Sequence, residues 1–185
     1  IISFYLSVTK KGIESFLAAL VPSEYEGYAI SLWKRSEHQV GRWLQGQLLL
    51  SLIMGLVVYV GLSLMKIKFA LVLGLLMMLL EIVPVAGPVL AAIPAVTLGF
   101  LQSPTLGIWV LIFYVIVQQI ENHMLVPLVL GKATGVNPVV VIIALLIGSN
   151  LAGIPGAILS VPVATIIVEI LDDLAKHKEM RRQAA

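Results

Sequence analysis

The most constraining feature of the 185-residue sequence is a block of 126 residues, from Trp43 to Val168, with only five formal charges. The other 17 of the 22 charged residues lie before or after this block. Because a helix needs roughly 20 apolar residues to cross the hydrocarbon core of a bilayer, the block predicts several membrane-spanning helices. The five charges inside it are Lys66, Lys68, Glu81, Glu121 and Lys132.

The composition excludes several classes of protein. Hydrophobic residues make up 59% of the chain and charged residues 12%, against about 25% charged residues in a soluble domain. A net charge of +2 provides no basic field, so we expect no nucleic-acid partner. The chain has no cysteine, its three histidines are scattered, and it contains no hydrolase or P-loop motif. We therefore expect no enzyme, no cofactor and no metal site.

The charge distribution divides the chain into three parts. Residues 1–42 are predicted to hold the end of an upstream membrane helix and amphipathic interfacial helices. Residues 43–172 form the predicted transmembrane transport domain, and residues 173–185 form a charged tail. Ten Lys and Arg residues fall at the two ends and in the loop with Lys132, against two at Lys66 and Lys68. The positive-inside rule then places both ends of the chain in the cytoplasm.

Two long apolar segments are each interrupted by glycine and proline. Residues 69–101 would make a straight helix of about 50 Å, which is too long for the bilayer. Residues 139–172 show the same pattern. The sequence therefore predicts an all-α, polytopic membrane protein with two broken helical hairpins, and it leaves open whether these are re-entrant or cross fully. The predicted breaks contain Pro84, Gly87, Pro88, Gly153, Pro155 and Gly156.

The two breaks also resemble each other in sequence. Residues 87–97 align without gaps on residues 155–165, which lie 68 positions later. Broken helices expose backbone groups that lipid cannot satisfy, so they occur against protein or a water-filled cavity. Paired breaks of this kind often mark a transporter binding site. The alternative is that glycine and proline here only shape the hairpins.

Four polar residues in the apolar block are candidates for a pathway. Glu81 precedes the first break, and burying a charge at this depth is costly unless it faces a cavity or a partner, or is protonated. Gln118, Glu121 and Asn122 fall at positions i, i+3 and i+4 of one helix. The alternatives are that Glu81 binds amides of the following turn, and that Glu121 lies at the membrane interface.

One row of small residues predicts close helix packing. Ala144, Gly148 and Ala152 recur every four residues, a spacing that lets helices approach closely. We interpret this row as a packing surface that favours a homo-oligomer.

Several short motifs resemble the AI-2E family of bacterial membrane transporters. They occur in order over about 175 residues: GRWLQGQ at 41–47, EIVPVAGP at 81–88, QQIEN at 118–122 and GIPGA at 153–157. The resemblance implies that this chain is the C-terminal part of a longer membrane protein. Members of the family are described as exporters of autoinducer-2, and others are linked to sodium/proton antiport.

The resulting hypothesis is a bacterial inner-membrane transporter whose partners are the lipid bilayer and a small polar solute or ions. It would export an autoinducer-2-like solute through a cavity between the two broken hairpins. Two alternatives stay open, which are a sodium/proton antiporter and a non-transporting scaffold or oligomeric assembly. The residues expected to line the pathway are Glu81, Gln118, Glu121 and Asn122.

Overall fold

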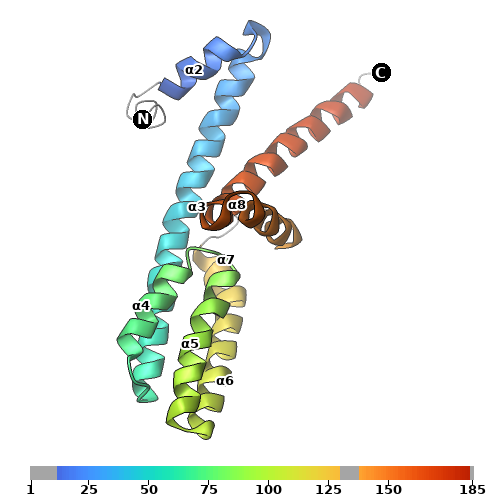
Figure 1. Cartoon of the computed structure of the whole chain (residues 1–185). Helices are drawn as coiled ribbons and strands as arrows, with labels where there is room; N and C mark the ends of the chain where they lie inside the picture. Colours follow the sequence, from blue (N-terminus) through green and yellow to red (C-terminus); the bar gives the residue numbers. More distant parts are fainter. Residues whose placement is uncertain (1–11, 130–137, 184–185) are drawn as a thin grey trace. The chain divides into compact units, whose positions relative to one another are not determined.

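In the computed structural model, residues 12–129 and 138–183 are described, and every regular element within these ranges is a helix (Figure 1). The predicted all-α class is therefore confirmed. The elements in chain order are α2 (Gly12–Leu20), α3 (Ser23–Leu64), α4 (Ala70–Leu80), α5 (Ala86–Gln102), α6 (Pro104–Ile120), the π-helix η1 (Glu121–Leu125), α7 (Val126–Val129) and α8 (Pro138–Gln183).

The chain divides into two compact units, residues 1–41 and 42–185. In the first unit, α3 begins at Ser23, and Glu24 and Glu26 in its first turn suit the positive end of the helix dipole. The sequence suggested an amphipathic helix that leads into a membrane span. The structure shows one helix of 42 residues that includes both stretches.

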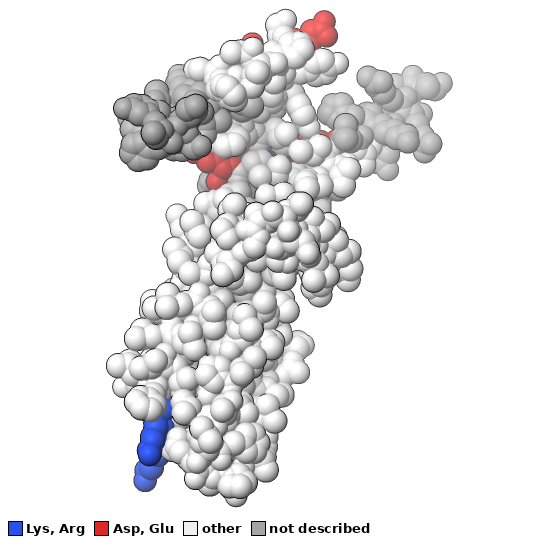
Figure 2. Space-filling view, viewed as in Figure 1, with Lys and Arg blue, Asp and Glu red and all other residues white. Residues whose placement is uncertain are grey.

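Three of the described helical stretches are long and apolar enough to cross a membrane: Ser23–Leu64, Pro104–Val129 and Val139–Leu171. Helices α4 and α5, with 11 and 17 residues, are shorter. On the face seen in Figure 2, the surface of the region of α4 to α6 is white except for basic atoms at its lower end, where the α3–α4 turn lies. This distribution fits a multi-pass membrane protein.

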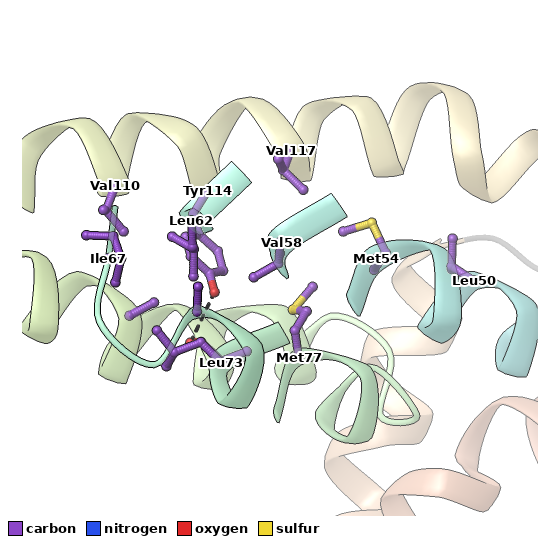
Figure 3. Packing of buried hydrophobic residues seen from close by; sticks show 13 residues of the cluster. Leu50, Met54, Val58, Leu62, Ile67, Leu73, Met77, Val110, Tyr114 and Val117 are labelled. Carbon is purple, nitrogen blue, oxygen red and sulfur yellow. Dashed lines mark hydrogen bonds between the residues drawn. The ribbon is translucent and has the colours of Figure 1, made fainter. Parts of the chain in front are cut away.

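The core of the second unit is a stripe along α3 that packs against α4 and α6 (Figure 3). The stripe recurs every three or four residues, as one helix face requires. Beside it, the Tyr114 hydroxyl of α6 donates a hydrogen bond of 3.5 Å to the Ala91 carbonyl of α5. The fully buried members of the cluster include Leu50, Met54, Val58, Leu62, Met77 and Val110.

Glycine allows α3 and α4 to touch backbone to backbone. A Cβ atom on Gly55 would lie 2.9 Å from the Gly74 carbonyl oxygen, and a Cβ atom on Gly74 would lie 2.8 Å from the Gly55 carbonyl oxygen. Helices that approach so closely gain dispersion contacts along their length, which is the main source of association in lipid. This crossing fixes α4, and with it the residue that follows α4, against α3.

The first break lies slightly earlier than its prolines suggested. Helix α4 ends at Leu80 and α5 begins at Ala86, so the chain leaves helical geometry before Pro84. Proline disfavours helical conformation at the residue before it and removes one N–H, so the helix ends upstream. The next helix starts with a side-chain cap: Ser103 precedes α6, and its hydroxyl accepts a hydrogen bond of 3.1 Å from the Leu106 N–H.

The second break is a kink inside α8. Ala152 and Gly153 have non-helical backbone angles, with φ of +61° at Gly153, and divide α8 into two arms (Figure 1). The arms meet where Gly148 and Gly156 touch through their backbones. Beyond this contact they enclose an apolar groove of about 380 Å³. Pro155 stands in the first turn of the second arm, where proline is tolerated.

Candidate functional site

Glu81 and Glu121 continue the buried faces of their helices into a polar layer. Glu81 follows Met77 of α4 by four residues, and Glu121 follows Val117 of α6 by four, so each lies one helical turn beyond the apolar core. Glu81 is 1% exposed and Glu121 is 4% exposed. These two carboxyl groups are therefore buried side by side at the end of the apolar cluster.

The two carboxyl groups form a pair. The Glu81 and Glu121 side chains lie within hydrogen-bonding range of each other. An ionised carboxylate can only accept hydrogen bonds, so a bond between two carboxyl groups requires a proton on one of them. Two buried negative charges in contact would also repel strongly. In this arrangement the pair holds one proton, which either of the two carboxyl groups can carry.

The partners of the pair are unequal. The Gln118 side chain donates from Nε2 to Oε2 of Glu121 at 3.0 Å. Oε2 of Glu81 accepts no hydrogen bond from an N–H or O–H group within the described ranges, and the Ser51 hydroxyl of α3 is another buried group without a hydrogen-bond partner there. Buried polar atoms are almost always satisfied in folded proteins, so an unmatched carboxyl oxygen points to a site that a small ligand or water completes.

Gln47 of α3 is a site residue that the sequence reasoning missed. Its side chain is 2% exposed and donates from Nε2 to the Glu81 backbone carbonyl at 2.6 Å. In the sequence it is one amide in an apolar helix, noticed only as the last residue of the GRWLQGQ motif. Its spacing offered a signal: Gln47 precedes Leu50 and Met54 by three and seven residues, so it shares their buried face.

The backbone of the first break is tightly constrained. Val85 has φ of 66° and ψ of −50°, and the Ala86 N–H donates to the Pro84 carbonyl at 2.7 Å, which together define a classic γ-turn. This turn is rare and strained for a residue with a side chain. Gly87 is buried against the Leu80 carbonyl, where a Cβ atom would overlap it. The turn holds the end of α4 and the start of α5 together.

The other predicted pathway residue takes a different position. Asn122 is exposed and does not join the buried pair, because it lies next to Glu121 and points to another side of the helix. Its neighbour His123 is also exposed, and its Nδ1 lies 2.9 Å from the Gln119 carbonyl oxygen. Lys132 lies outside the described residues.

At the second break, the polar side chains that immediately precede it bond to their own helix. The Ser149 hydroxyl and the Asn150 amide both donate to the Leu146 carbonyl of their own helix, at 3.0 Å and 2.8 Å. Gly148 of the predicted small-residue row packs against Gly156 inside the hairpin. Within the described ranges, no group of three or more His, Asp or Glu side chains is arranged to hold a metal ion.

Comparison with known proteins gives a consistent family. The AI-2E family transporter pattern matches residues 1–176. The chain is 31% identical over 183 residues to "Putative transport protein YueF" of Bacillus subtilis (strain 168), covering 99% of this chain and 50% of that protein. It is 34% identical over 142 residues to "AI-2 transport protein TqsA" of Escherichia coli (strain K12), covering 74% of this chain and 40% of that protein.

The matches extend over enough of this chain to identify its family, but they include only part of each relative. The chain spans about half the length, or less, of these curated relatives. The family pattern nevertheless includes all the residues of the buried pair and both breaks. The chain belongs to the AI-2E transporter family.

Proposed function

We propose that the protein exports a small polar solute across the bacterial inner membrane, and that the Glu81–Glu121 pair lies on the solute pathway and carries a proton during the cycle. The observation that supports this most directly is the unmatched, buried Oε2 of Glu81 beside a second carboxyl group. A carboxyl group in such a place is costly, and membrane proteins keep intramembrane carboxyl groups mainly for ion, proton or solute pathways.

The name of one relative suggests the solute. The Escherichia coli relative is named as an AI-2 transport protein, so autoinducer-2 is the first solute to test. We place the pathway between the two broken hairpins, with Gln118 beside the pair. By the distribution of Lys and Arg, both ends of this chain face the cytoplasm. The hairpin of α8 is proposed as the contact in a homo-oligomer.

A second candidate is cation/proton antiport. A pair of carboxyl groups that holds one proton can exchange that proton for a monovalent cation, because loss of the proton leaves a negative site of suitable size and ligand type. This mechanism uses the same residues as export. It differs in one requirement: an imposed sodium gradient must move protons.

The test uses the full-length protein in proteoliposomes with an imposed pH gradient and autoinducer-2 as the solute. Glu81→Gln keeps the shape and hydrogen-bonding capacity of the side chain but cannot release a proton. We expect this substitution to lower the initial transport rate at least about tenfold and to remove the dependence of that rate on pH, because replacing a proton-transfer group commonly costs this much or more. The matched control is Ser149→Ala, at the position that aligns with Glu81 in the second break.

The outcomes separate the candidates. Unchanged flux and pH dependence in Glu81→Gln would remove the pair from the mechanism. Proton movement driven by a sodium gradient, lost in Glu81→Gln, would favour antiport over solute export. Absence of both solute and proton movement in the unaltered protein would favour the non-transporting scaffold.

A further inference from the structure

We propose that Gln47 is the positioning residue of the carboxyl pair: by binding the Glu81 carbonyl it holds the end of α4 so that the Glu81 side chain meets Glu121. The inference rests on the proposed function, since it concerns the same pair. It adds a third helix to the site, because Gln47 lies on α3, Glu81 follows α4, and Glu121 begins η1 after α6.

The end of α4 needs a donor from outside its own helix. The last four carbonyl groups of a helix have no partner within it, and Pro84 in the following turn has no N–H to offer. Glu81 is 1% exposed, so bulk water does not replace the missing donor, and an unsatisfied carbonyl there is costly. The Gln47 amide supplies a donor at 2.6 Å to the carbonyl of the residue that carries the carboxyl group.

The anchored atom is two bonds from the Cα atom of the functional residue. Fixing the Glu81 carbonyl therefore fixes the direction in which its side chain leaves the backbone. Gln47 is 2% exposed and Glu81 is 1% exposed, so neither has space to reorient without moving a helix. A strained conformation persists only where its surroundings hold it, and the γ-turn at Val85, four residues on, is such a conformation.

Carbodiimide labelling reports on the pair without any transported solute. N,N′-dicyclohexylcarbodiimide reacts with protonated carboxyl groups in apolar surroundings. The carboxyl O–H adds across one C=N bond, and the acyl group then migrates to nitrogen to give a stable N-acylurea, with no leaving group and no redox change. If Glu81 and Glu121 share one proton in contact, reaction at one consumes the proton and the bulky adduct blocks the other. Mass spectrometry of the two peptides measures the labelled fraction at each site, and the mass of the intact protein measures the doubly labelled fraction.

The experiment compares the unaltered full-length protein in liposomes with three variants. Gln47→Met removes the amide with little change in volume, and Gln47→Asn keeps an amide one methylene too short to reach Glu81. Gln45→Met makes the same chemical change at an exposed position of the same helix. Thermal unfolding shows which variants retain a cooperative fold, and Gln47→Asn serves if Gln47→Met does not fold.

We expect the doubly labelled fraction in the unaltered protein and in Gln45→Met to be about tenfold below the product of the two singly labelled fractions. In folded Gln47→Met or Gln47→Asn, it should rise about tenfold to equal that product, because the two carboxyl groups then react independently. Exclusive labelling in both folded Gln47 variants would overturn the inference and leave the proposed function intact. If the two carboxyl groups of the unaltered protein are labelled independently of each other, the paired site itself is overturned. If labelling of one excludes labelling of the other but the protein transports nothing, only the proposed function is overturned.

Discussion

The two helix breaks share a backbone design and differ in what surrounds them. Each has one residue of positive φ, Val85 in the first and Gly153 in the second, and these two positions are 68 residues apart, as are the aligned segments that follow. Each is closed by a glycine in backbone contact with the preceding helix, Gly87 on Leu80 and Gly156 on Gly148. The placement of these residues is therefore similar, although the turns differ: ψ is −50° at Val85 and −137° at Gly153.

Neighbouring helices supply the polar groups at the first break. At the first break, α3 contributes Gln47 and η1 contributes Glu121, and both bind Glu81. At the second, Ser149 occupies the aligned position and bonds to its own helix. A broken hairpin therefore creates available backbone groups, and the elements packed against it determine whether they become a polar site or an apolar groove.

The largest expected effect tests whether both breaks depend on a glycine in close backbone contact with the preceding helix. Gly87→Ala should destabilise the full-length protein by about 3 kcal/mol, because the added Cβ atom would overlap the backbone of Leu80, which cannot move cheaply. Gly156→Ala should have a similar effect through Gly148. Denaturant unfolding in detergent micelles measures both.

Gly41→Ala is the control for this pair, since nothing lies within 4 Å of the position where its Cβ atom would stand. In a helix, alanine there should be neutral or stabilising by up to about 1 kcal/mol. A neutral Gly156→Ala beside a destabilising Gly87→Ala would show that only the first break is tightly closed.

An intermediate effect tests the polar surroundings of the first break. Gln118→Leu should destabilise the protein by about 1.5 kcal/mol, because Glu121 loses a 3.0 Å hydrogen bond in a buried place. The neighbouring Gln119 is exposed, so Gln119→Leu should change the free energy of unfolding by less than about 0.5 kcal/mol. Equal effects at the two positions would mean that Gln118 does not support the pair.

The smallest expected effect compares the two positive-φ residues. Val85→Gly should stabilise the protein by about 1 kcal/mol, since glycine adopts the γ-turn without strain and the Val85 side chain is 57% exposed. Gly153→Ala should destabilise it by about 1 kcal/mol, although nothing lies within 4 Å of its Cβ position. A loss of stability in Val85→Gly would show that this side chain packs against lipid or a partner in the membrane. Thermal unfolding of both variants provides the measurement.

Much of the fold could be predicted from local sequence rules. The scarcity of charge predicted membrane helices, and Ser103 before Pro104 is the pattern of capping residue and first-turn proline that starts a helix, as it does in α6. The position of the first break was less accurate, because the prolines at 84 and 88 mark where a helix cannot continue rather than where it stops. The second break was predicted at 153–156 and turns at 152–153 for the same reason.

The site was only partly visible in the sequence, because its contacts join residues far apart in the chain. Glu81 was singled out by the cost of a buried charge and Glu121 by its place on a polar helix face, but their pairing depends on the packing of α4 against α6 through α3 and α5. Gln47 lies 34 residues from its acceptor. Asn122 was grouped with Glu121 by helical spacing, and that rule could not show which of two adjacent side chains points inward.

The π-helical turn at Glu121–Leu125 changes the phase of the helix that carries the second carboxyl group. The core-facing residues before it are Val110, Tyr114 and Val117, and continued α-helical spacing after Glu121 would turn Met124 and Leu128 inward. Instead these two are 64% and 80% exposed, and the residues one position later in the chain, Leu125 and Val129, pack on the core together with Val126. The extra residue in the turn thus adds a rotation of about 100°. One inserted residue lets a single helix keep both its carboxyl group and its apolar end directed to the same side.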